Sequence, residues 1–280
     1  MNTCKYCGDN EAIENSHIIP SFICRWVKET SPTNVLRSSI NPNVRQQDGE
    51  KEPLLCKQCE GEFSTYERAF KKVFSQMANY RKDFPNEIKF TKETLSCITS
   101  IAWRVLAGQY YFPKDHLYTR DEVDRFPEFL DKMKEQISSG VQNYTVHFIP
   151  CTKEVIKKVG LPQIDFSYYE RSFGAEPRIW DDWARFIIYI KIPFGIFVVE
   201  LVKNNHDIWT GTKLSYENPF LIVNVEKVPP VIGYQVSHFF GEFLKSLSKL
   251  TEKQKELMRK DINNFKGDCG SFKTNRKKWD

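Results

Sequence analysis

Two Cys-x2-Cys pairs are the clearest chemical signal in the sequence: Cys4 with Cys7, and Cys56 with Cys59. Thiolate sulfur is a preferred ligand of zinc, and structural zinc sites are closed by four ligands in a tetrahedron. Two such pairs supply the full ligand set, so the spacing predicts a structural zinc ion. The remaining cysteines show no such pairing and are expected to be ordinary core or surface thiols: Cys24, Cys97, Cys151 and Cys269.

A histidine and a glutamate accompany this predicted metal site. His17 lies between the two cysteine pairs, and Glu60 directly follows the last cysteine. Pro20 disfavours helix at the residue before it, so His17 is expected on an extended segment or at its end. An imidazole transfers protons near neutral pH, and a carboxylate suits Mg²⁺ or Mn²⁺. Considered alone, His17 is more typical of a packed core histidine than of a functional one.

The order of these residues resembles a known family. Ser-His-Ile-Ile-Pro at 16–20 resembles the first half of an HNH motif, and Leu-Leu-Cys-Lys-Gln-Cys-Glu at 54–60 resembles the second half. The sequence also follows the family's order of cysteine pair, histidine on a strand, loop, second cysteine pair and helix. Residues 1–75 therefore resemble the zinc-containing ββα-metal (His-Me finger) nucleases, which include the HNH endonucleases.

The resemblance implies roles for individual residues. His17 would be the general base that activates water against a phosphodiester, and zinc on the four cysteines would be structural. Glu60, with Ser16, would bind a catalytic Mg²⁺ or Mn²⁺. DNA is the expected substrate, and proteins of this kind often act in anti-phage or mobile-element contexts. The basic side chains that could contact phosphates, or simply form the solvent face of a helix, are Lys71, Lys72, Arg81 and Lys82.

Three departures from the family pattern leave alternatives open. Ser16 occupies a position that is usually Asp or His, and Glu60 is unusual after the last cysteine. The middle Asn has no clear match, since Asp48, Glu50 and Lys51 occupy that area. The first alternative is a non-catalytic zinc-finger module that binds nucleic acid or protein. A second is a structural subunit of a larger complex. Glu67, two turns after Glu60, fits either the metal region or a salt bridge.

Composition and charge place the chain among globular proteins. It has 280 residues, 40% of them hydrophobic and 28% charged, with a net charge of +5. Residues 241–280 carry 11 Lys and Arg against 6 Asp and Glu, which accounts for the whole excess. A basic tail fits a polyanionic partner or a solvated helix end. We expect no transmembrane helix and no signal peptide, and therefore a location in the reducing cytoplasm. NTPase, dinucleotide-binding and α/β-hydrolase motifs are absent.

The pattern of apolar residues predicts an α+β fold in three parts. Residues 1–80 form the zinc-clamped ββα-metal finger, 81–140 a helical connector, and 141–280 a mostly antiparallel sheet with helices and a basic tail. This last part would position substrate, form a homo-oligomer or bind a partner protein. Helices are expected at 22–29, 54–74, 91–111, 121–139 and 233–260, the last one split near Thr251. Strands are expected at 144–149, 164–172, 184–192, 195–202 and 219–225.

Overall fold

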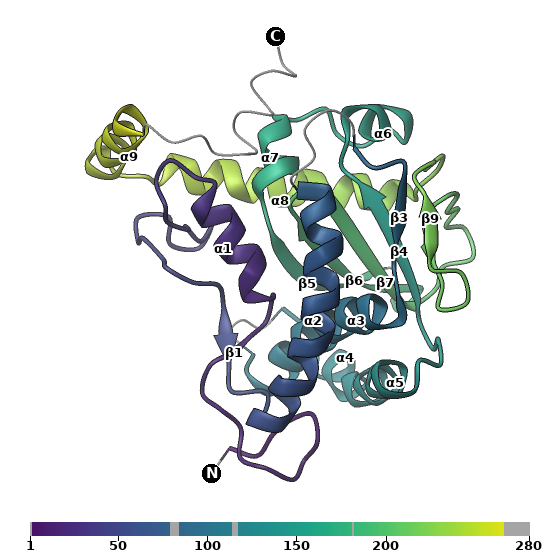
Figure 1. Ribbon diagram of the computed structural model, residues 1–280. Helices are drawn as coiled ribbons and strands as arrows, with labels where there is room; N and C mark the ends of the chain where they lie inside the picture. The colour runs from purple at the N-terminus through teal and green to yellow at the C-terminus, as the bar shows by residue number, and fades with distance from the viewer. Residues whose placement is uncertain (1, 79–83, 114–116, 181, 266–280) are drawn as a thin grey trace.

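A five-stranded antiparallel sheet lies at the centre of the computed structural model (Figure 1), with strand order β5-β6-β7-β4-β8. The structure describes residues 2–78, 84–113, 117–180 and 182–265. The strands are β4 (Thr145–Pro150), β5 (Gly174–Trp180), β6 (Arg185–Ile192), β7 (Gly195–Val202) and β8 (Lys213–Leu214). β6 and β7 form a tight hairpin, in which Phe194 adopts a positive φ of 63°. The expected antiparallel sheet and its hairpin turn are confirmed.

Nine helices surround the sheet in the described residues: α1 (Ser21–Glu29), α2 (Lys57–Ala78), α3 (Lys92–Tyr111), α4 (Arg120–Asp124), α5 (Phe126–Ser139), α6 (Lys153–Lys158), α7 (Phe166–Arg171), α8 (Pro230–Ser248) and α9 (Glu252–Asn264). Two small antiparallel ribbons complete the fold. One pairs β1 (Ser16–His17) with β2 (Lys51–Glu52), and the other pairs β3 (Glu87–Lys89) with β9 (Phe220–Ile222). The fold is therefore α+β.

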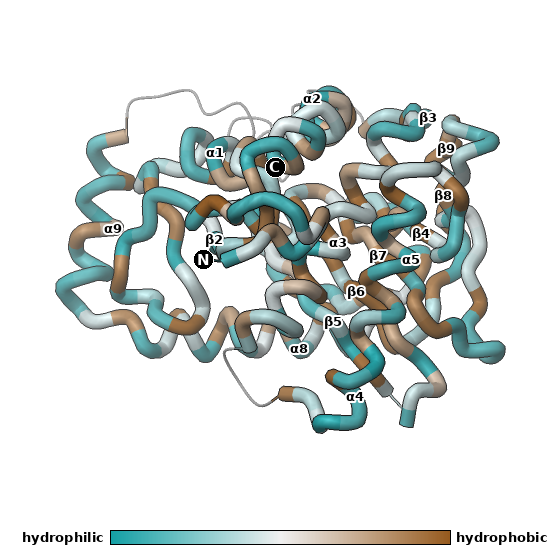
Figure 2. The backbone as a smooth tube through the Cα atoms, turned by 90° about the horizontal axis from the view of Figure 1, so that it is seen from below, coloured by the Kyte–Doolittle hydropathy of each residue, from teal (hydrophilic) through white to brown (hydrophobic). Residues whose placement is uncertain are grey.

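Both faces of the sheet are covered, which explains the long apolar runs of its strands. Side chains of a strand alternate between faces. In β6, Phe186 and Ile188 contribute to the core that includes α2 and α3. Ile187 and Tyr189 instead contribute to a second core that includes α8. The central strands are largely brown, or hydrophobic, in Figure 2, as expected for strands covered on both faces.

Local sequence signals set several helix ends as expected. The Thr91 and Thr251 side chains accept hydrogen bonds from the first turns of α3 and α9, which satisfies backbone N–H groups that have no partner within the helix. Gly140 ends α5 in the left-handed conformation, with a φ of 78°. The expected break between α8 and α9 is also confirmed.

Four expectations about elements are wrong. The strand expected at 164–172 is replaced by α7 (Phe166–Arg171), because the Asp165 carboxylate caps the helix by accepting from the Ser167 N–H at 2.9 Å. The helix expected at 121–139 is divided into α4 and α5, since Pro127 favours a new first turn. β9 pairs with β3 instead of joining the main sheet. β5 lies where no strand was expected.

One core connects the three parts that the sequence suggested. Its buried residues run from Cys4 and Ile23 near the N-terminus, through α2 and α3, to Phe197 in the sheet and Leu221 in β9. The N-terminal cysteine segment is thus packed on the same apolar interior as the sheet. Within the described ranges, no helix combines the length and apolar character needed to cross a membrane.

Candidate functional site

The four predicted zinc ligands come together in the structure. The sulfur atoms of Cys4, Cys7, Cys56 and Cys59 all lie within 4.8 Å of one another. Cys4 Sγ is 3.9 Å from Cys59 Sγ, and Cys7 Sγ is 3.9 Å from Cys56 Sγ. A tetrahedral zinc with Zn–S bonds of about 2.3 Å separates its sulfurs by about 3.8 Å. The donor set and its spacing therefore fit a zinc ion, and the distances are too long for disulfides.

Two local turns present these thiols. The Gly8 N–H donates to the Cys4 carbonyl at 3.0 Å, with Gly8 at a φ of 80°, which closes the first turn. The second pair is different, because Cys56 immediately precedes α2 and Cys59 lies in its first turn. The Lys5 N–H donates to the Leu54 carbonyl at 2.7 Å and joins the two turns.

The thiol pKa values show why a cation belongs here. Burial raises the pKa of Cys4 and of Cys59, the latter also through its neighbouring thiols. Burial also acts to raise the pKa of Cys7, but backbone N–H groups of Asn10 and Asp9 outweigh it and lower that pKa to about 6. Buried thiolates need positive charge to be stable, and a divalent cation at the centre of the four sulfurs supplies it.

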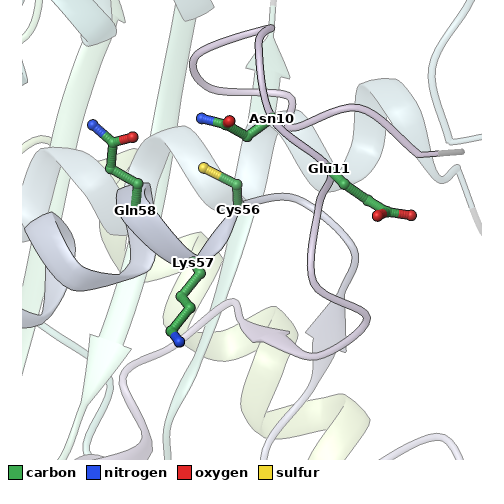
Figure 3. A pocket seen from close by; sticks show the side chains of 5 residues that line it. All are labelled: Asn10, Glu11, Cys56, Lys57 and Gln58. Atoms are coloured by element: carbon green, nitrogen blue, oxygen red, sulfur yellow. The ribbon is translucent and has the colours of Figure 1, made fainter.

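A shallow cavity lies beside Cys56, one of the four clustered cysteines (Figure 3). Its volume is about 390 Å³, and its lining residues are Asn10, Glu11, Cys56, Lys57 and Gln58. Neither His17 nor Glu60 lines it. The cavity therefore lies beside Cys56 and does not include the predicted catalytic residues.

His17 lies on β1 and is paired with an acid that the sequence did not identify as its partner. His17 Nε2 is 2.9 Å from Asp48 Oδ2, and the His17 side chain keeps 24% of its surface exposed. The same Asp48 oxygen is 2.7 Å from Lys51 Nζ, while the Gly49 N–H donates to the other oxygen at 2.9 Å. Burial acts to raise the pKa of Asp48, but bonds from Lys51, His17 and Gly49 lower it to about 2.

The backbone of His17 is fixed by a buried arginine. Arg104, on α3, has a side chain that is 1% exposed. Its Nη1 donates to the His17 carbonyl oxygen at 2.7 Å and to Glu67 Oε1 at 3.0 Å. Glu67 lies on α2, so one guanidinium joins α3, α2 and β1. Of the two roles considered for Glu67, the structure shows the salt bridge.

Ser16 lies on β1 and Glu60 on α2, and both are predicted ligands of a catalytic cation. The Ser16 hydroxyl is fully buried and accepts from the Leu55 N–H at 3.2 Å. Glu60 lies in the first turn of α2, where its buried Oε1 has no hydrogen-bond partner among the described residues. Among all the residues that the structure describes, the four cysteines are the sole group of three or more His, Cys, Asp or Glu side chains whose donor atoms lie close enough together for a metal. Glu60 thus does not join His17 and Asp48 in such a group.

The predicted phosphate contacts are located only in part. Lys71 and Lys72 are exposed on α2, whereas Arg81 and Lys82 lie outside the described residues. Sequence reasoning missed the roles of Asp48 and Arg104. Asp48 lies where the family's middle Asn was expected, which was a usable signal. Arg104 is embedded in the apolar pattern of α3 and carried no signal.

Comparisons with known proteins add no relative from which a role could be transferred. A scan against protein-family models, a search of curated proteins and a search of solved structures each found no match. The chemistry of this chain is therefore argued from its own geometry.

Proposed function

We propose that the chain is a metal-dependent endonuclease of the HNH, or His-Me finger, type that hydrolyses phosphodiester bonds in DNA. The observation that carries this proposal is the His17–Asp48 pair at 2.9 Å, which joins β1 to the loop before β2. The β1–β2 ribbon followed by α2, with thiols before β1 and at the start of α2, supports it further. A ββα-metal finger has two paired strands and a helix in this order, and here α1 is inserted between the strands.

His17 has the tautomer that a general base needs. The low pKa of Asp48 keeps its carboxylate ionised, so Nε2 of His17 carries the proton and donates it in the 2.9 Å bond. His17 Nδ1 then holds a free lone pair, and no partner occupies it in the described part of the chain. This nitrogen would accept a proton from water as the water attacks phosphorus. The carboxylate would stabilise the imidazolium that forms.

Glu60 is the residue that would hold a divalent cation. A buried carboxylate oxygen without a partner is costly, and a cation would satisfy it. Ser16 can contribute its hydroxyl oxygen, since the Leu55 N–H occupies one of two lone pairs. When bound, Mg²⁺ or Mn²⁺ stabilises negative charge on the phosphate and the leaving oxygen. Lys71 and Lys72, exposed along α2, would contact backbone phosphates.

A second candidate function is a non-catalytic zinc-finger module that binds nucleic acid. The observation that favours it is that Glu60 does not gather with His17 and Asp48 into a three-donor group in the described residues. Such a module would keep the zinc centre and the basic side chains of α2. It would bind DNA without cutting it.

Cleavage of supercoiled plasmid separates the two functions. The zinc-loaded protein would be incubated with plasmid and Mg²⁺ or Mn²⁺, beside His17→Ala and Glu60→Ala. His206→Ala is the matched control, because His206 is an exposed histidine far along the chain. The nuclease should nick plasmid, and both site variants should lose at least about 100-fold in rate while the control does not. Binding by the wild type without cleavage under any of these metals would establish the module instead.

A further inference from the structure

A hairpin-like loop, residues 36–46, connects the candidate site to the C-terminal helices. Its ends are joined by two backbone hydrogen bonds of 2.9 Å between Leu36 and Gln46. Figure 1 shows the segment that contains it lying beside α1 and close to α9, which projects from the end of α8. Loop 36–46 is separated from α9 by more than 200 residues in sequence.

Three side chains of the loop contact the C-terminal helices, one at the junction between α8 and α9 and two along α9. Asn43 uses both ends of its amide: Nδ2 donates to the Lys249 carbonyl at 2.9 Å, and Oδ1 accepts from the Thr251 N–H at 2.9 Å. Lys249 ends α8 and Thr251 begins α9, so a single amide bonds to both helix termini. The other two contacts are Arg45 with Asp261 at 2.8 Å and Arg37 with Gln254 at 2.9 Å.

α9 itself depends on these contacts. None of its residues is buried, and Figure 2 shows it largely hydrophilic along its length. A helix that buries no side chain gains little from packing, so its position relies on its junction with α8 and on the polar contacts to the loop. The loop in turn lies outside the main core. The loop therefore helps to fix the position of α9, and α9 helps to fix the position of the loop.

The chain between this contact and Asp48 is held at each residue. Arg45 binds Asp261, Gln46 bonds to Leu36, and the Gln47 carbonyl accepts from Lys28 Nζ on α1 at 3.1 Å. Asp48 follows directly. Only residues 46 and 47 separate Arg45 from Asp48, so the contacts of Arg45 limit where the Asp48 carboxylate can lie.

We propose that the α8–α9 junction positions Asp48, and through it the imidazole of His17, with Asn43 as the positioning residue. This inference rests on the proposed nuclease function of His17. It assigns the C-terminal helices a role in setting the geometry of a site that lies in the first 60 residues. Loss of the Asn43 contacts releases loop 36–46 from the α8–α9 junction, and the remaining contacts of Arg45, Gln46 and Gln47 then constrain Asp48 less tightly.

The test compares Asn43→Ala with Asn41→Ala, a matched control on the same loop whose exposed side chain makes no hydrogen bond among the described residues. Plasmid-cleavage kcat and KM, zinc content, and the NMR resonances of the His17 imidazole would be measured for both. Asn43→Ala should lower kcat about tenfold, the effect of losing an outer hydrogen-bond partner, with KM and zinc unchanged. The His17 resonances should move toward those of Asp48→Asn. Asn43→Ala that matches Asn41→Ala in kcat and in the resonances overturns the proposal.

A charge swap gives a second, independent variant. Arg45→Asp places two carboxylates together at Asp261 and should lower kcat, while Arg45→Asp combined with Asp261→Arg should restore it. Failure of the swap to restore both kcat and the resonances would count against positioning through this contact. The two proposals fail differently. A wild type that does not cut DNA removes the nuclease function, yet the imidazole resonances still report whether Asn43 fixes His17.

Discussion

At the scale of single residues, the charge of Asp48 decides how His17 can act. The carboxylate accepts from His17, Lys51 and the Gly49 N–H, and these bonds outweigh burial in lowering its pKa to about 2. Such a carboxylate is ionised near neutral pH. It therefore fixes the proton on His17 Nε2 and leaves Nδ1 as the acceptor.

Asp48→Asn tests this directly. The amide keeps the size of the side chain but can present its NH₂ group to the imidazole, which favours the wrong tautomer. Cleavage should fall by about 10²-fold or more, since loss of the orienting carboxylate in a comparable His–Asp pair is severe. Zinc content should not change. Asp121→Asn, at an exposed position on α4, provides the control in the same plasmid assay. Equal rates for the two variants would refute the orienting role.

We expect Cys56 to contribute both to zinc binding and to the stability of the fold. It is buried at the start of α2, and its sulfur is one of the four within 4.8 Å of one another. Cys56→Ser should abolish the stoichiometric zinc, and the Tm should drop by about 10 °C or more because metal binding contributes folding free energy. Elemental analysis and a thermal scan measure both. Cys151→Ser, a buried free thiol outside the cluster, should keep about one zinc per chain. Retention of zinc by Cys56→Ser would exclude the four-thiol site.

At the scale of elements, Arg104 joins three of them with one side chain. It contributes a buried guanidinium from α3 to Glu67 on α2 and to the backbone of β1. A single apolar replacement leaves the Glu67 carboxylate, 21% exposed, and the His17 carbonyl without their donor. Removing one member of a buried ion pair costs more than removing both.

Arg104→Met should therefore lower the free energy of unfolding by about 3 kcal/mol or more. Arg104→Met combined with Glu67→Leu should recover at least about 1 kcal/mol of this loss, because no buried charge remains unpaired. Urea denaturation of the wild type, both single variants and the double variant completes the cycle. A double variant no more stable than Arg104→Met would show that the ion pair does not connect these elements energetically.

Elements were predictable where their signal was long or their caps were local. α2 and α3 are long helices with apolar residues at three- and four-residue spacings, and Thr251 marks the start of α9. In short elements, residue preferences for helix or strand were misleading. α7 is rich in aromatic residues that favour strands, but the Asp165 cap decides for helix. β5 contains Pro177, which a sheet tolerates at this edge position because an edge strand can lack a ladder hydrogen bond.

At the scale of the whole molecule, a contact between distant residues could be predicted only where their chemistry requires it. The four cysteines could be placed together because zinc demands it. Asp48 could not be assigned to His17, since its loop carries no periodic pattern. Asn43 bonding to Lys249 and Thr251 joins segments more than 200 residues apart, and a single sequence contains nothing that implies it. The candidate metal centre was thus predictable, and the network that orients the histidine was not.

Lys191 makes global stability depend on pH. It is 3% exposed in β6, and its Nζ donates to the carbonyls of Tyr169 and Ser172 at 2.7 and 3.4 Å. Burial lowers the pKa of Lys191 from 10.5 to about 8, against an opposing effect of Cys151 and Glu170. Below about pH 8 both folded and unfolded chains hold the proton, and the folded state bears the full cost of a buried charge. Between about pH 8 and 10.5 the unfolded chain binds more protons, so this cost is relieved and stability rises with pH.

The rise should appear as a difference between the wild type and Lys191→Met. Free energies of unfolding would be measured at pH 7, 8, 9 and 10. The wild type should gain on the variant as pH increases above 8, by at most about 3 kcal/mol, since each pKa unit corresponds to about 1.4 kcal/mol. Taking the difference removes the titration of the buried tyrosines, which both proteins share. Lys203→Met, at an exposed lysine after β7, should track the wild type at all four pH values. A constant difference between wild type and Lys191→Met from pH 7 to 10 would mean that Lys191 titrates normally in the folded chain.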